Sequence, residues 1–183
     1  MKRVEIIYGG ASNEKEISYL TAKSIYEHID TDLYNPGLTD LSKFDPDNFD
    51  NETIFFIAVH GEGGEDGKIQ TQLENKKRKF TGSRSESCIL TWDKVATKRA
   101  LIANDILTPQ FKSIKNNERF DFNDSFFAEN EHYFVKPNFN GSSYGISKVS
   151  DKKFNEALKE AKNYSTEVII EKSFNGPEYT VAL

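Results

Sequence analysis

The sequence is poor in several features that would place it in other protein classes. It has one cysteine, Cys88, so an internal disulfide is impossible, which suits a reducing compartment. No hydrophobic run approaches the about 20 residues of a membrane-spanning helix, and the N-terminus carries no signal-peptide core. Lys and Arg number 24 against 29 Asp and Glu, a net charge of -5 that disfavours nucleic-acid binding. These absences predict a cytoplasmic protein that binds neither membranes nor nucleic acids.

The residues that are present predict two folded sections in a globular chain. Hydrophobic residues make up 37% of the 183 residues and charged residues 29%, enough apolar surface for a substantial core. Apolar runs at 4–8 and 53–59 are predicted strands, and a helix is predicted between them. Its buried face is expected to consist of residues at helical spacing, Ile17, Leu20, Thr21, Ala22, Ile25 and Ile29.

Helix-capping and loop-forming residues add detail to the prediction for this first section, residues 1–91. Asn13 is expected to cap the helix, because Glu16 follows it at capping-box spacing. Residues 30–52 are rich in Asp, Asn and Pro and are predicted to form a loop, and a short helix is predicted near 69–74. Alternating strands and helices favour a parallel sheet covered by helices, so the fold class is α/β.

The second section, residues 92–183, is predicted to be α+β. Strands are expected at 132–137, 145–149, 167–171 and 178–183, and a helix at 153–164. Another helix is expected at 93–104, with Val95, Leu101 and Ile102 on its inner side and Thr108-Pro109 ending it.

The segment after the strand at 53–59 is the most informative part of the chain. His60 is followed by four glycines within residues 61–67. Glycine loses more backbone entropy on folding than other residues, so such a cluster needs a reason. Open α/β sheets bind small molecules at the carboxyl ends of their strands, where backbone must approach the ligand closely. A tight turn is the alternative explanation, although two glycines normally suffice for a turn.

A second loop rich in glycine and serine, residues 138–145, follows Lys136. The backbone amides of such a loop can surround phosphate oxygens, and a neighbouring lysine can neutralise their charge. A β-hairpin with a loose turn and an exposed lysine explains the same residues, and the pattern alone leaves both explanations open. Glu171 and Glu178 could accept hydrogen bonds from a ribose or an adenine amino group, or be ordinary surface acids.

Taken in order, these segments resemble the D-alanine–D-alanine ligase family of the ATP-grasp superfamily. The resemblance covers nearly the whole chain, and its strength lies in the order and spacing of the motifs. The matching segments are 8–18, 59–61 with 64–70, 80–83, 92–94 with 97–98, 135–137 with 141–145, and 170–172 with 176–181. The resemblance implies an N-terminal, Rossmann-like pre-ATP-grasp domain followed by an ATP-grasp domain.

For the substrate, the resemblance implies a two-step ligation of two D-alanines, through an acylphosphate, for peptidoglycan precursor synthesis. Glu14 would hold the ammonium group of the first D-alanine, and His60 would help to place its carboxylate. Ser142 would join Glu14 in the catalytic substrate network.

For the nucleotide, the resemblance implies ATP bound mainly by the second section. Lys94 and Lys136 would bind its phosphates, and Ser142, Ser143 and the loop amides would close over them. Glu171 would bind the adenine edge and Glu178 the ribose.

The chain also departs from the family pattern. Ser173 stands where an aromatic residue is common, and Trp92 where a smaller apolar residue is usual. The sequence ends at Leu183, inside the ATP-grasp domain, before the loop lysine and tyrosine, the arginine and the magnesium ligands of the family. The resemblance therefore predicts that Mg2+ is held by residues beyond this chain, that these 183 residues are inactive alone, and that the enzyme is a homodimer.

Two other functions are compatible with the same residues. One is a sister ligase that joins D-alanine to D-lactate or D-serine, because the residues that decide this choice lie in the missing loop. The other is a binding module without turnover.

Overall fold

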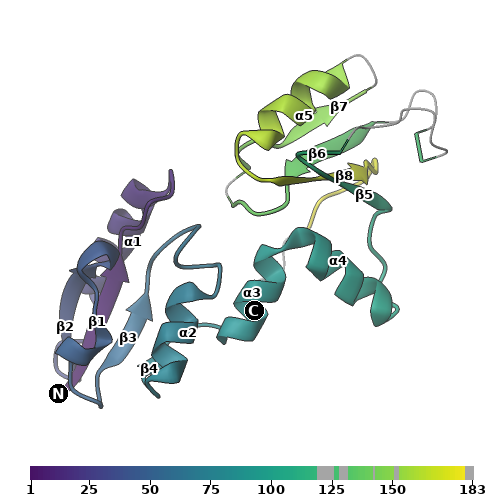
Figure 1. Cartoon of the computed structure of the whole chain (residues 1–183). Helices are drawn as coiled ribbons and strands as arrows, with labels where there is room; N and C mark the ends of the chain where they lie inside the picture. Colours follow the sequence, from purple (N-terminus) through teal and green to yellow (C-terminus); the bar gives the residue numbers. More distant parts are fainter. Residues whose placement is uncertain (119–125, 128–131, 142, 151–152, 180–183) are drawn as a thin grey trace. The chain divides into compact units, whose positions relative to one another are not determined.

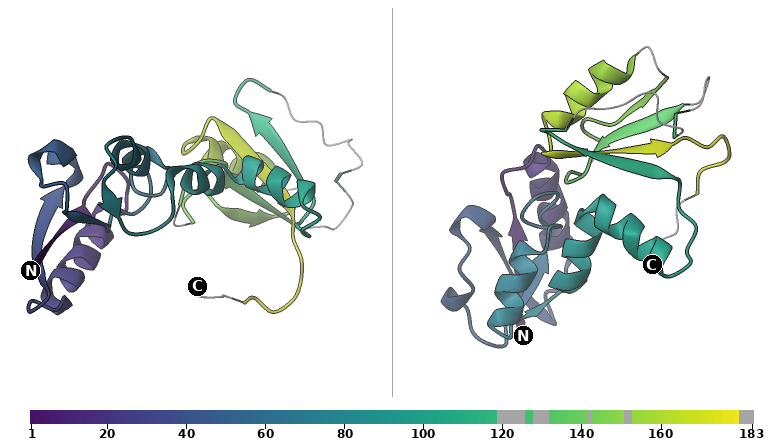
Figure 2. Two further views of the ribbon diagram at one scale, coloured as in Figure 1. Left: turned by 90° about the horizontal axis from the view of Figure 1, so that it is seen from below. Right: turned by 45° about the vertical axis from the view of Figure 1, so that its right-hand side comes forward.

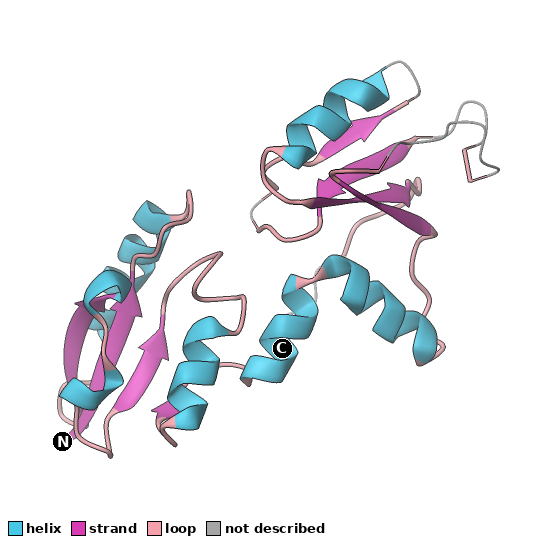
Figure 3. Ribbon diagram, viewed as in Figure 1, coloured by secondary structure: helices cyan, strands magenta, loops and turns pink. Residues whose placement is uncertain are grey.

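The computed structural model describes residues 1–118, 126–127, 132–141, 143–150 and 153–179. The chain divides into two compact units, Met1–Asp93 and Lys94–Leu183 (Figure 1). The first contains a parallel sheet with helices, and the second an antiparallel sheet with helices, as the secondary-structure colouring in Figure 3 shows. This agrees with the predicted α/β section followed by an α+β section. None of the helices in the described part of the chain is long and apolar enough to span a membrane.

The sheet of the first unit has the strand order β2-β1-β3-β4, with all neighbours parallel. Its strands are β1 (Lys2–Tyr8), β2 (Tyr34–Asp40), β3 (Ile54–Ile57) and β4 (Lys79–Phe80). Its helices are α1 (Lys15–His28), α2 (Lys68–Asn75) and α3 (Ser85–Trp92).

Alternate residues of β1 face opposite sides of this sheet, as the two-residue period of a strand requires. Ile6 packs in one cluster with Ala22 of α1, and Ile7 packs in another with Leu73 of α2. The helices α1 and α2 therefore cover opposite faces of the sheet (Figure 2). The predicted helix-covered parallel sheet is confirmed.

The prediction of a loop at 30–52 was wrong. This segment contains β2 and two short 3-10 helices, η1 (Leu41–Lys43) and η2 (Pro46–Asn48). β2 is an edge strand, where Pro36 is tolerated because a proline there need not donate to a second neighbour.

The start and the buried face of α1 also differ from the prediction. Asn13 does not cap the helix: α1 begins at Lys15, its N-cap residue is Glu14, and no side chain caps it. Ser18 and Ala22 are its buried residues, whereas Ile17 and Leu20 are 52% and 53% exposed. Ser18 can be buried in place of an apolar residue because its hydroxyl accepts a hydrogen bond from the Gly9 amide and donates one to the Ala58 carbonyl.

The sheet of the second unit has the order β5-β8-β6-β7, with all neighbours antiparallel. Its strands are β5 (Phe111–Lys115), β6 (Tyr133–Pro137), β7 (Ser147–Val149) and β8 (Glu167–Lys172). Its helices are α4 (Lys94–Ala103) and α5 (Phe154–Lys162). The core lies between α5 and the sheet, where Tyr133, Val135, Phe154 and Ala161 are all at most 1% exposed.

Several expectations for this unit need correction. β5 was not predicted, and Glu178 and Tyr179 lie in no strand, while 180–183 are outside the described residues. The buried residues of α4 are Val95 and Lys98, whereas Ile102 is 56% exposed. A lysine replaces an apolar residue on the inner side of this helix.

Candidate functional site

The carboxyl ends of β1 and β3 are joined by a buried serine of α1. The Gly9 amide donates to Ser18 Oγ at 2.8 Å, and Ser18 Oγ donates to the Ala58 carbonyl at 2.8 Å. Both bonds are buried, where a hydrogen bond is protected from competing water. They fix the loop after β1 against the end of β3 and so preform one edge of the sheet.

The structure brings Glu14 and His60 to that edge. Ser12 Oγ donates to the His60 carbonyl at 2.8 Å and accepts from the Glu14 amide at 3.2 Å. His60 Nε2 is 3.0 Å from Thr21 Oγ1 of α1. A Cβ atom placed on Gly61 would lie 2.9 Å from Glu14 Oε2, so the Glu14 carboxylate lies against the backbone of the glycine loop. Ser12 thus links the backbones of Glu14 and His60, and a half-buried carboxylate and an imidazole at one end of the sheet are groups that can bind a small zwitterion.

The glycine loop is also a tight turn, so part of its composition is structural. Gly61 has φ +71°. A Cβ on Gly64 would lie 2.2 Å from the Val59 carbonyl oxygen, which no side chain tolerates. The Gln70 side chain donates to the Gly64 carbonyl at 2.6 Å and holds the loop against α2. Both explanations of this segment therefore have support.

A pocket of about 460 Å³ adjoins the same edge, and His60, Thr21, Gln70, Thr81, Cys88 and Thr91 are among its lining residues. Cys88 is a free cysteine. Burial, followed by nearby carboxylates, raises the pKa of its thiol. A cysteine with a raised pKa is a poor nucleophile, so the pocket is better suited to binding than to thiol catalysis.

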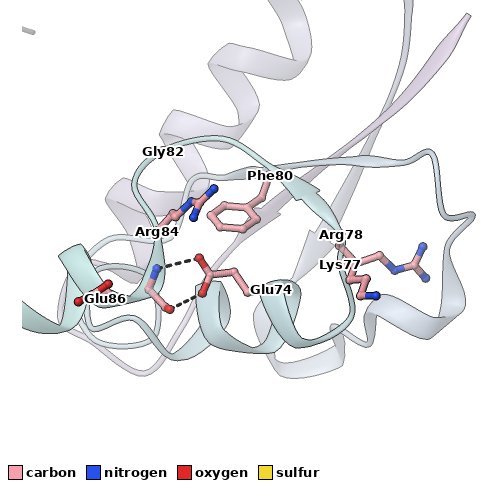
Figure 4. Close-up of a pocket in the computed structure, with 8 residues that line it drawn as sticks. Glu74, Lys77, Arg78, Phe80, Gly82, Arg84 and Glu86 are labelled. Carbon is pink, nitrogen blue, oxygen red and sulfur yellow. Dashed lines mark hydrogen bonds between the residues drawn. The ribbon is translucent and has the colours of Figure 1, made fainter.

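A larger pocket, of about 640 Å³, lies between the end of α2 and the start of α3 (Figure 4). Glu74 accepts hydrogen bonds from the amide and the hydroxyl of Ser85 across it. Arg78 is buried and donates to the Pro46 and Phe49 carbonyls, so it stabilises the fold. None of the residues that the sequence suggested for a site lines this pocket.

In the second unit, Glu171 of β8 lies between two lysines. Lys98 Nζ is 2.8 Å from Glu171 Oε1, and Lys136 Nζ pairs with Glu171 Oε2. Burial alone would raise the pKa of Glu171, but the hydrogen bonds and charges of Lys136 and Lys98 outweigh it and lower that pKa. Glu171 is therefore an ionised, half-buried acceptor.

Lys94 lies at the base of the glycine–serine loop. Its Nζ donates to the Asn138 carbonyl at 3.2 Å and to the Asn140 carbonyl at 2.6 Å. β6 and β7 form an antiparallel hairpin, as in one of the two explanations that the sequence left open for this loop. Lys94 therefore lies against the loop that follows β6, and the Lys136–Glu171 ion pair joins β6 to β8 in the same unit.

For the remaining predicted site residues, the structure gives little information about a role. Ser142 lies outside the described residues. Ser143 is exposed and has φ +62°, and Glu178 is exposed in the segment after β8. Lys98 was missed as a site residue, and the only signal for it was its place in the motif that includes Lys94. Among the described residues, no group of three His, Cys, Asp or Glu could hold a metal ion.

Comparisons with known proteins bear on the family that the sequence resembles. The family model for the D-ala D-ala ligase C-terminus matches residues 101–183. The chain is 34% identical to the D-alanine–D-alanine ligase of Marinomonas sp. over 193 residues, covering 98% of this chain and 59% of that protein. Over nearly its whole length the chain is similar to one part of the D-alanine–D-alanine ligases. It spans about three fifths of the length of the curated relatives that it matches.

Solved structures of the D-alanine–D-alanine ligase family show the same fold. The crystal structure of the Bacillus anthracis D-alanine–D-alanine ligase complexed with ATP matches 96% of this chain and 60% of its own, with a TM-score of 0.84 and 27% identity. The VanG D-Ala:D-Ser ligase of Enterococcus faecalis matches with a TM-score of 0.78 at 23% identity, which shows the fold alone.

Proposed function

We propose that this chain provides the first D-alanine site and part of the ATP site of a D-alanine–D-alanine ligase. The observation that carries the proposal is the meeting of Glu14, Ser12 and His60 at the carboxyl edge of the parallel sheet. The names of the relatives, and the ATP complex of the Bacillus anthracis enzyme, support the choice of substrates.

In this proposal the first unit binds and orients D-alanine. The Glu14 carboxylate pairs with the substrate ammonium, and the charge-assisted hydrogen bond fixes its orientation. His60, held by Thr21, places the substrate carboxylate. Ser142 completes the substrate network. Because binding has already fixed the orientation of the substrate, one carboxylate oxygen can approach the γ-phosphorus of ATP without a further loss of rotational entropy.

The reaction then follows from two nucleophilic steps. The carboxylate oxygen of the first D-alanine bonds to the γ-phosphorus, and ADP leaves. The amine of the second D-alanine attacks the acylphosphate carbon and loses a proton, and inorganic phosphate leaves. The products are D-alanyl-D-alanine, ADP and phosphate, and the protein contributes positioning and charge neutralisation.

The second unit would supply the nucleotide contacts. Lys94 and Lys136 would neutralise phosphate oxygens, with Ser142, Ser143 and the loop amides around them. Glu171 would accept from the adenine amino group, and Glu178 would bind the ribose. The described residues offer no cluster for Mg2+, so none of them is assigned to it. The expected setting is a cytoplasmic homodimer that makes a peptidoglycan precursor.

The proposal is tested by amide chemical-shift mapping of the 15N-labelled chain. D-Alanine is expected to shift the amides of residues 9–14 and 60–64, and L-alanine to leave them unchanged. One or two charged contacts of about 1.5–3 kcal/mol each correspond to weak, roughly millimolar binding. ATP is expected to shift Lys94, Lys136 and Glu171. Equal effects of the two alanine enantiomers, or no effect of either, would overturn the proposed substrate.

A further inference from the structure

The two ammonium groups that pair with Glu171 have unequal surroundings. The Lys98 side chain is 6% exposed, and its Nζ also donates to Thr108 Oγ1 at 2.7 Å. The ring centroid of Phe111 lies 5.2 Å from the same Nζ. Three groups from three parts of the unit therefore hold Lys98 in place.

Lys136 is held less firmly. Its side chain is 22% exposed, and besides Glu171 its contact in the described part of the chain is the Phe134 ring, 5.5 Å from Nζ. It lies on β6, directly before the loop whose carbonyls Lys94 binds. Of the two lysines, Lys136 is the one that can leave Glu171 and reach an anion at this loop.

We propose that Lys98 is a positioning residue for the nucleotide site. It keeps Glu171 paired and fixed, so that the Lys136 side chain can move its ammonium group away from Glu171 and pair with a nucleotide phosphate. This inference rests on the proposed function, because it takes the ligand to be ATP. It gives Lys98 a role that does not require contact with the nucleotide.

The physical reason is the cost of an unpaired buried charge. Glu171 has a side chain only 12% exposed, and an ionised carboxylate there is strongly destabilised when it loses its last partner. With Lys98 in place, departure of Lys136 leaves one ion pair intact. Without Lys98, departure of Lys136 would strand Glu171, so Lys136 would stay and the phosphate would lose its cation.

Lys98→Met is therefore expected to weaken ATP binding to the full chain by about tenfold or more, the effect of one lost charge-assisted contact. Lys98→Gln, which can still hydrogen-bond Thr108, should show a similar loss of ATP affinity. It replaces the methionine variant in the experiment if that variant folds poorly. Arg99→Met is the matched control, since Arg99 is an exposed cation on the same helix. It is expected to bind ATP as the wild type does.

A double-mutant cycle separates this role from a merely structural one. In a Lys136→Met background, Lys98→Met should have little further effect on the ATP dissociation constant, because there is no ammonium left to release. In the wild type, the side-chain ammonium signal of Lys136 should move on ATP addition while that of Lys98 stays.

The outcomes are distinguishable. Unchanged ATP affinity in both Lys98 variants, or additive losses in the double variant, would overturn the role of Lys98 while leaving the proposed nucleotide site standing. A wild-type chain that does not bind ATP at all would overturn both.

Discussion

Gly61→Ala is expected to damage D-alanine binding more than it damages the fold. Gly61 has φ +71°, a conformation that costs an alanine about 1–2 kcal/mol. The new methyl group would lie 2.9 Å from Glu14 Oε2 and 3.1 Å from Ser12 Cβ. The end of the Glu14 side chain can rotate away, so the added steric cost is small. The carboxylate then leaves its position, and binding loses a contact of about 1.5–3 kcal/mol.

Gly82→Ala provides the matched control. Gly82 also has a positive φ, +97°, but a Cβ there meets nothing within 4 Å. Both variants should lose about 1–2 kcal/mol of unfolding free energy in urea titrations. Only Gly61→Ala should lose the D-alanine-induced amide shifts, with an affinity roughly ten to a hundred times weaker. Wild-type D-alanine affinity in Gly61→Ala would refute the assignment of Glu14 to the substrate.

Three further predictions concern charge and packing. Glu14→Gln should weaken D-alanine binding by about tenfold or more in NMR titrations, whereas Glu16→Gln, on the exposed side of the helix, should not. Gly64→Ala should cost about 3 kcal/mol or more in urea unfolding because its methyl group meets a carbonyl, whereas Gly176→Ala, with open space around it, should be nearly neutral. Since the pKa of Glu171 is lowered in the fold, its stabilisation is present above the ordinary glutamate pKa and is lost as pH falls through the lowered pKa. The stability gap between wild type and Glu171→Gln should therefore be about 3 kcal/mol at pH 7 and close in acid; a gap independent of pH would contradict the ion pairs.

The local pattern of apolar residues was sufficient to predict the central strands and the long helices. β1 and β3 are apolar runs, and α5 has its buried residues at helical spacing. The missed strands β2, β4 and β5 all lie at sheet edges. Edge strands bury fewer side chains and accept residues such as Pro36, so their sequences carry little alternation.

For the candidate site, too, the local sequence pattern revealed only some of the residues. The glycines after β1 and β3, with the family resemblance, were enough to suggest Glu14 and His60. Ser18 and Lys98 were missed as interior residues because hydrophobic periodicity assigns polar side chains to the surface. Each is buried only because partners from distant segments satisfy it, and such partners are set by the tertiary fold.

The most direct measurement is D-alanyl-D-alanine formation by a hybrid enzyme. In it, these 183 residues replace the matching 59% of the Marinomonas ligase. With ATP, magnesium and D-alanine, the hybrid is expected to release ADP and D-alanyl-D-alanine in equal amounts, and its Glu14→Gln variant to release far less of both. A hybrid that folds and binds ATP but forms no dipeptide would contradict the account.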